Sequence, residues 1–271
     1  MWTREGLKSN AKEVLKKHYW YLFLATIITG FLSGGGIGFS YNFNFSSIFN
    51  LFNTNNYNNN FDYYNPNISG FDSQTFFAAL IIGLIVFSII FIIVLAFSYA
   101  YKIFVINPFE VGRNKYFLNA REDKANLEDI IYSFKNRRYK NVVKAMAWRD
   151  LFIFLWTLLF TIPGIVKGYA YSMVPYLLTD NPNMSYGRAL KLSMDMTRGE
   201  KGDIFVLDLS FIGWYLLGLM ACGIGIIFVT PYYFATKAEL YLALRHKALQ
   251  QGLCSYEELG FTRPNTNTIE N

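Results

Sequence analysis

The feature of this sequence that most constrains its fold is an apolar run at residues 76–106, in which Lys102 is the one charged residue. As a helix, the run would measure about 46 Å, which exceeds the roughly 30 Å of a bilayer's hydrocarbon core. Only 16% of the chain is charged and 53% is hydrophobic, whereas soluble domains carry about 25% charged residues. The run therefore predicts a tilted or protruding transmembrane helix rather than an element of a soluble core.

Two longer apolar stretches each contain a break. Residues 142–179 would form a helix of about 57 Å and residues 203–246 one of about 66 Å, too long for a single crossing. Pro163-Gly164 interrupts the first stretch and Cys222-Gly-Ile-Gly225 the second, and such residues favour turns. We therefore expect an all-α, polytopic transmembrane helical bundle with two Gly/Pro-broken hairpins and peripheral amphipathic helices. Its six segments are about 19–40, 76–106, 142–162, 165–179, 204–221 and 226–246.

The basic residues predict how these segments are oriented. Residues 1–18 hold five lysines and arginines and residues 107–141 hold eight, whereas residues 41–75 hold none. Because basic loops stay on the cytoplasmic side, we expect a multi-pass protein of the cell membrane with cytoplasmic N- and C-termini. A cleaved signal peptide is the alternative reading of 19–40, but the long basic region before it and the later segments favour a retained helix.

Residues 1–18 and 185–199 have the spacing of amphipathic helices, with Thr3 and Ser185 as candidate N-caps. We expect the first, a basic helix, and the second to lie on an anionic inner leaflet. The second would turn its basic face towards the lipid headgroups. The candidate headgroup contacts are Arg188, Lys191 and Arg198.

The connections between segments differ in composition. Residues 41–75 contain eleven asparagines and are expected to form a flexible outer loop. In the cytoplasmic loop 107–141, Asn126 is the expected cap of a short helix. Residues 247–271 form a polar C-terminal tail that we expect to be disordered. The chain thus divides into an N-terminal helix, a bundle at 19–246 and this tail.

Three charged residues fall inside the apolar segments, where charges are functional hypotheses by default. They are Asp150, Lys167 and Asp208. Residues 150–156 and 208–214 resemble each other at a period of 58 residues, so the two aspartates are expected at equivalent depths near the inner face. Arg149 and Lys201 are their nearest basic candidates along the chain. Lys167 is expected to reach outer headgroups or a backbone carbonyl without meeting either aspartate.

Motifs of catalysis and metal binding are missing from the sequence. It contains no GxSxG, HExxH or P-loop, and its two cysteines and two histidines lack metal-ligand spacing. We therefore expect no enzyme activity, no cofactor and no metal. The net charge of +6 comes without a groove-reading motif, which argues against nucleic acid as a partner. A lipid bilayer is the expected partner, and a homo-oligomer or a membrane-protein partner stays open.

Several motifs resemble those of a known family. They are TREGLKSNAKEVLKKHYW at the N-terminus, NPFEVGRNKYFL (107–118), IPGIVKGYAYSMVPYLLTDNP (162–182), ALKLSMDMTRGEKGDIFVLDLSFIGW (189–214) and GIGIIFVTPYYFAT (223–236). Together they resemble domain-of-unknown-function family 975, uncharacterised integral membrane proteins mainly of Gram-positive bacteria. The resemblance implies a polytopic helical membrane protein and brings no site residue with it.

Two functions fit these observations. The first is a non-enzymatic, envelope-associated or scaffold protein of the cytoplasmic membrane. The alternative is a transporter or lipid-handling protein with a path at the repeat interface. A water-accessible cavity joining Lys167, Asp150 and Asp208 would favour the alternative, and a bundle filled by Phe, Leu and Gly, with these charges facing headgroups, would favour the scaffold.

Overall fold

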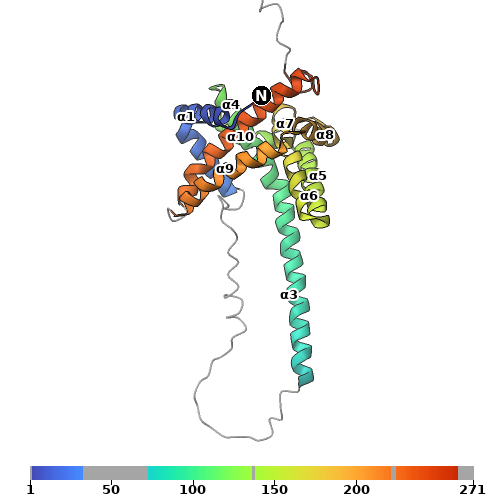
Figure 1. The fold of residues 1–271 in the computed structure, drawn as a ribbon. Coiled ribbons are helices and arrows are strands. Elements are labelled where there is room, and N and C mark those ends of the chain that lie inside the picture. Colours follow the sequence, from blue (N-terminus) through green and yellow to red (C-terminus); the bar gives the residue numbers. More distant parts are fainter. Residues whose placement is uncertain (1, 33–72, 136–137, 221–223, 262–271) are drawn as a thin grey trace, which may run out of the picture. The chain divides into compact units, whose positions relative to one another are not determined.

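The computed structural model describes residues 2–32, 73–135, 138–220 and 224–261, and within them every regular element is helical (Figure 1). The all-α expectation is therefore confirmed. The chain divides into two compact units, Phe39–Ala100 and Met1–Gly38 with Tyr101–Asn271. The elements are α1 (Arg4–Leu32), α3 (Ser73–Tyr101), a π-helical turn η1 (Lys102–Ile106), α4 (Asn107–Arg121), a 3₁₀ helix η2 (Leu127–Phe134), α5 (Arg138–Leu159), α6 (Thr161–Ala170), α7 (Val174–Asp180), α8 (Tyr186–Met196), α9 (Lys201–Met220) and α10 (Ile224–Gln250).

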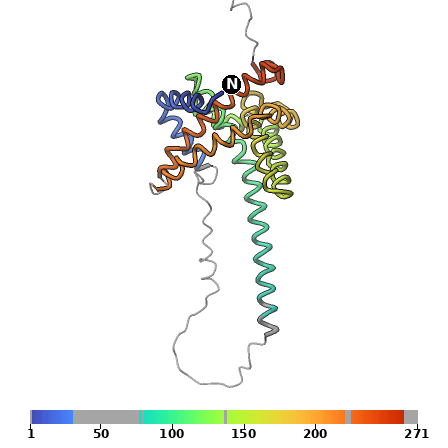
Figure 2. Tube along the Cα trace, in the orientation of Figure 1, coloured from blue at the N-terminus to red at the C-terminus, as the bar shows by residue number. Residues whose placement is uncertain are grey.

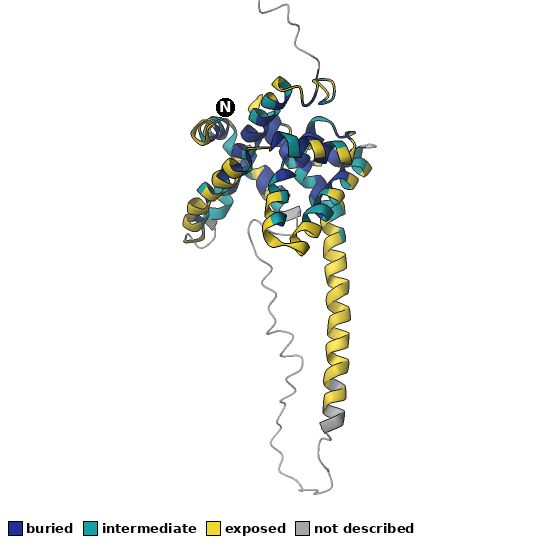
Figure 3. Cartoon of the chain, turned by 45° about the vertical axis from the view of Figure 1, so that its right-hand side comes forward, coloured by how far each residue is buried: buried dark blue, intermediate teal, exposed yellow. Residues whose placement is uncertain are grey.

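Helix α3 carries apolar side chains on all faces, and none of its described residues is buried (Figure 3). A helix that is apolar all round needs an apolar environment. Among the described residues, Leu80–Arg121 and Lys201–Met220 are long and apolar enough to cross a membrane, judged by length and composition. These two helices support membrane association, a coarser result than the six segments expected. Of the Asn-rich stretch 41–75, the structure describes only residues 73–75.

The N-terminal helix changes direction where the expected boundary lies. His18 has non-helical dihedral angles (φ −125°, ψ 19°) and divides α1 into a basic part and an apolar part. Thr3 caps the first part, since its Oγ1 accepts a hydrogen bond from the Gly6 N–H at 3.1 Å. The apolar face of this part is buried at Leu7 and Ala11, and α1 packs against α10 and α4. That face therefore contacts protein, where a leaflet was expected.

The first hairpin forms by a reversal at Phe160, whose extended backbone (φ −153°, ψ 135°) separates α5 from α6. The break lies three residues before the predicted Pro163-Gly164. Pro163 sits in the first turn of α6, where its missing N–H costs nothing. Gly164 is required by the close approach of the arms, because a Cβ there would lie 2.6 Å from Cα of Thr157.

The returning arm of this hairpin is not the single segment 165–179 that we expected. Helix α6 ends at Ala170, and α7 begins at Val174 with Pro175 in its first turn. With ten residues, α6 rises only about 15 Å. This arm is therefore too short to cross a 30 Å hydrocarbon core as one helix.

The second hairpin joins α9 to α10, which pack side by side (Figure 2). Gly218 and Gly225 allow their backbones to meet, because a Cβ on Gly225 would lie 2.6 Å from Cα of Gly218. Of the predicted break at Cys222–Gly225, the first two residues lie outside the described part of the chain, and Ile224 and Gly225 begin α10. Helix α10 then runs through Pro231 to Gln250 without interruption.

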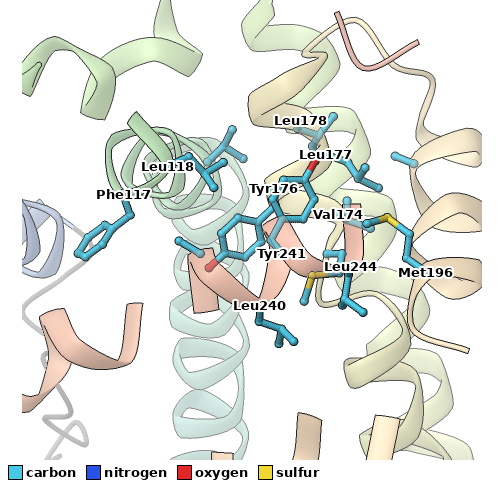
Figure 4. Packing of buried hydrophobic residues seen from close by; sticks show 14 of the residues in the cluster. Phe117, Leu118, Val174, Tyr176, Leu177, Leu178, Met196, Leu240, Tyr241 and Leu244 are labelled. Carbon is cyan, nitrogen blue, oxygen red and sulfur yellow. The ribbon is translucent and has the colours of Figure 1, made fainter. Parts of the chain in front are cut away.

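The core of the larger unit gathers around α4, α7 and α10. Tyr176 of α7 stacks on Tyr241 of α10, with ring centroids 5.1 Å apart, and Leu177 and Leu240 are fully buried beside them (Figure 4). Burying each such side chain contributes roughly 1.5–3 kcal/mol. The core therefore includes much of 107–141, where α4 forms a buried helix within the segment expected to be a cytoplasmic loop.

Three further predictions concern η2, α8 and the C-terminal segment, near this core. Asn126 caps η2 through a capping box with Asp129, so the predicted short helix is confirmed. Ser185 caps α8 as expected, but the apolar face of α8 is buried in the core, as Leu192 shows. The expectation of a disordered tail is wrong for residues 247–261, because 247–250 belong to α10 and the segment that follows buries Leu259. Residues 262–271 lie outside the described part.

Both hairpins carry exposed apolar side chains, as α3 does. On the first hairpin the large exposed ones run from Phe154 to Val166, and on the second they run from Phe205 to Phe228. Arms α5 and α10 pack against α4, and α5 also packs against α7. The first hairpin therefore has an apolar closed end and a packed base, whereas the second exposes apolar side chains along all of α9 as well as at its closed end.

Candidate functional site

A cavity of about 230 Å³, lined by charged, aromatic and apolar residues, lies at the base of the two hairpins. Of the three charged residues expected inside the apolar segments, Asp208 lines it, whereas Asp150 and Lys167 do not. Charged side chains of α4, α5, α9 and α10 line it, together with tyrosines and the link between α6 and α7. The lining residues are Glu110, Arg113, Asn114, Arg149, Ile153, Gly168, Tyr171, Ser172, Met173, Tyr176, Asp208, Tyr233, Phe234 and Lys237.

On the α4–α5 side, Arg149 holds two carboxylates. Its Nη atoms donate to both carboxylate oxygens of Glu110 at 3.2 Å, and its Nε donates to Asp150 at 3.0 Å. Asp150 also meets Lys102 at 3.0 Å and accepts a hydrogen bond from Asn107 at 2.9 Å. A buried ion pair needs such additional hydrogen bonds to offset desolvation. The predicted Asp150–Arg149 pair is confirmed, and Lys102 is a partner that the sequence did not indicate.

On the α9–α10 side, Lys237 lies 2.6 Å from Asp208. The expectation of Lys201 as the partner is wrong, because the two arms are antiparallel and bring Lys237 across to Asp208. Lys201 lies seven residues earlier on α9, a rise of about 10 Å. The ammonium group of Lys237 also lies 5.5 Å from the ring centroid of Tyr233.

Lys167 is separated from both aspartates, as expected. Its ammonium group lies 5.2 Å from the ring of Trp156 and 3.9 Å from the sulfur of Met194. The neighbouring Gly168 lines the cavity, whereas Lys167 does not. Met194 belongs to α8, so Lys167 cannot face the outer side while α8 lies on the inner leaflet. At least one of these two expectations is therefore wrong.

Arg113 is a cavity residue that the sequence reasoning missed. Its guanidinium carbon lies 3.8 Å from the ring centroid of Phe234. Its Nε is buried and has no hydrogen-bond partner among the described residues. Arg113 belongs to the segment read as a cytoplasmic loop, and no spacing in the sequence indicated that α4 would place it at a cavity.

The three candidate headgroup contacts, two on α8 and Arg198 just after its end, differ in their surroundings. Arg188 donates to Glu258 at 2.5 and 2.9 Å and to the Leu253 carbonyl at 2.7 Å. It therefore fastens the C-terminal segment, so its guanidinium is not available to lipid as expected. Arg198 lies 3.1 Å from Asp195 and is largely exposed, and Lys191 is exposed.

Three larger hollows, of about 570, 550 and 350 Å³, lie beside Trp2. Their buried acids are already paired, Glu200 with Lys247 and Glu239 with Arg121. The cavity at the hairpin base differs because it gathers charges from four helices around one space. We therefore treat it as the candidate site.

Comparisons with known proteins place the chain in a family but assign it no activity. The model of a family described as a protein of unknown function, DUF975, matches residues 37–248. No curated protein and no solved structure matches the chain. The match covers most of the sequence, including every residue that lines the cavity. This chain therefore belongs to the DUF975 family.

Proposed function

We propose that this protein is a multi-pass protein of the cell membrane, with cytoplasmic termini, that binds a polar ligand as a transporter or lipid-handling protein. The observation that carries the proposal is the cavity at the base of the hairpins. It is lined by Arg113, Arg149 and Lys237, and by the acids Glu110 and Asp208. A scaffold has no need for charged side chains around an interior space, because each costs desolvation energy.

The apolar ends of the hairpins support the membrane part of the proposal. Large exposed apolar surfaces mark sites of protein or membrane contact, and both hairpins expose such side chains at their closed ends. We propose that these ends enter the bilayer together with α3 and the apolar part of α1. The basic face of α8, at Lys191 and Arg198, would then lie near headgroups.

The cavity favours binding over chemical conversion. Ser172 is its hydroxyl nucleophile candidate, but its Oγ donates to the Tyr169 carbonyl at 2.7 Å, so no base activates it. Asp208 is engaged by Lys237. Since nucleophilic catalysis needs a base within hydrogen-bond reach of the nucleophile, we propose a non-enzymatic role.

Cysteine accessibility tests this proposal. In a chain with Cys222 and Cys254 replaced by alanine, Ser172→Cys in vesicles of both orientations should react with a small, membrane-impermeant thiol reagent. Ser193→Cys is the matched control, because Ser193 is fully buried and does not line the cavity. If Ser172→Cys resists the reagent from both sides as Ser193→Cys does, the ligand-binding role is wrong and the scaffold role is favoured.

A further inference from the structure

We infer that the cavity binds a phosphate group, carried by a lipid headgroup or as free phosphate, and that Arg113 is the residue that holds it. This inference rests on the proposed function, since it names the ligand class of the same site. It follows from the way in which the buried charges are already paired.

All but one of the cations around the cavity have a carboxylate partner. Arg149 forms ion pairs with Glu110 and Asp150, and Lys237 forms one with Asp208. Arg113 forms no ion pair in the described part of the chain, although Glu110 lies one turn before it on α4. Because Glu110 is committed to Arg149 through both of its oxygens, Arg113 is the positive charge left for a ligand.

The guanidinium group of Arg113 is held in place and yet incompletely bonded. The ring of Phe234 covers its carbon at 3.8 Å, a stacking geometry that fixes a guanidinium plane. Its buried Nε has no hydrogen-bond partner among the described residues, and a ligand or a water molecule can supply one to a buried polar atom. A ligand oxygen would satisfy it with a charge-assisted hydrogen bond.

The remaining lining suits an acceptor with several oxygens. Tyr171, Tyr176 and Tyr233 are among the lining residues, and a phenol hydroxyl that faced the cavity would donate a hydrogen bond to a phosphate oxygen. The volume of about 230 Å³ is smaller than the roughly 300–1,000 Å³ of sites for drug-sized ligands. It therefore matches an ion or a headgroup rather than a whole lipid.

The site lies beside the apolar ends of the hairpins. On α5, Ile153 lines the cavity and the next residue, Phe154, is exposed. On α6, Gly168 lines the cavity and Val166, two residues earlier, is exposed. With the hairpin ends in a bilayer, the cavity would lie at the depth of lipid phosphates. A lipid headgroup and free phosphate share this chemistry, and the experiment separates them.

The test measures ligand binding to the purified full-length protein by isothermal titration calorimetry. The probes are inorganic phosphate and dioctanoyl phosphatidylglycerol, with dioctanoylglycerol as the lipid that lacks phosphate and chloride at equal ionic strength as the salt control. We expect a phosphate-bearing probe to bind, and we expect Arg113→Gln to weaken the affinity for that probe at least tenfold. Lys115→Gln, on the same helix but outside the cavity, should leave binding unchanged.

Binding of phosphatidylglycerol alone identifies a lipid phosphate, and binding of both probes identifies a site that also takes free phosphate. If Arg113→Gln does not fold, Tyr171→Phe should weaken the binding of the same probe. That probe should also raise the thermal unfolding temperature of the wild type. The inference is overturned if neither probe binds or if folded Arg113→Gln binds as the wild type does. Should Ser172→Cys be accessible while neither probe binds, the inference fails and the proposed function stands.

Discussion

Lys237 of α10 reaches Asp208 of α9 at 2.6 Å, so one ion pair ties the two arms of the second hairpin together at the edge of the cavity. Both side chains are mostly buried, at 12% and 23% exposure. The pair therefore fixes the spacing of the arms as well as the charge of the cavity wall.

Removing one partner of this pair should destabilise the protein more than removing both charges. Asp208→Asn or Lys237→Gln leaves a buried charge without its partner, which costs roughly 3–5 kcal/mol, and the double variant should recover part of that loss. Thermal unfolding in detergent measures the three variants. Losses that simply add would show that the two groups are not coupled. Lys124→Gln, in an exposed pair with Glu122, serves as the control and should change little.

Gly112→Ala should destabilise the core. A Cβ at this position of α4 would overlap the carbonyl group of Ile130 in η2, and backbone cannot move aside as a side chain can. Overpacking of this kind costs about 1–3 kcal/mol. Gly213→Ala, with nothing within 4 Å of the added carbon, should be neutral or stabilising by up to about 1 kcal/mol. Equal unfolding temperatures for the two variants would contradict the close contact.

The C-terminal segment should detach as the pH falls. The hydrogen bond from Arg188 holds the pKa of Glu258 below its usual value, which is about 4.3 in unfolded chains. A lowered folded-state pKa stabilises the docked segment above that value, and this contribution is lost as pH falls through the folded pKa. In a Cys222→Ala background, the reaction of buried Cys254 with dithiodipyridine should therefore quicken below about pH 4.

Glu258→Gln should remove this pH dependence and expose Cys254 at neutral pH. Glu257→Gln is the matched control, because Glu257 lies beside it on the exposed side of the segment. A thiol that stays equally protected in Glu258→Gln at pH 7 would show that Arg188 does not hold the segment.

The orientation of the chain gives a fourth prediction. A cysteine at Asn55, in the Asn-rich stretch, should react with an impermeant reagent from outside intact cells, and a cysteine at Lys124 should react only after the cells are opened. The reason is that loops rich in lysine and arginine stay inside. The opposite pattern would reverse the proposed topology.

The local elements could be predicted from the sequence. Helix caps at Thr3, Ser185 and Asn126 follow from neighbouring residues. They depend on hydrogen bonds within a few residues, so the sequence alone determines them. The Asp150–Arg149 pair belongs to the same class, because its partners are adjacent.

Contacts between distant segments were decided by the tertiary structure. Lys237 replaces Lys201 beside Asp208 because an antiparallel arm brings it there. The apolar faces of α8 and of the first part of α1 are covered by protein, although their periodicity equally suits a leaflet. Arg113 became a site residue only when α4 packed between α1, α7 and α10. An amphipathic pattern states that a face must be covered, and only the packing of the chain decides whether protein or lipid covers it.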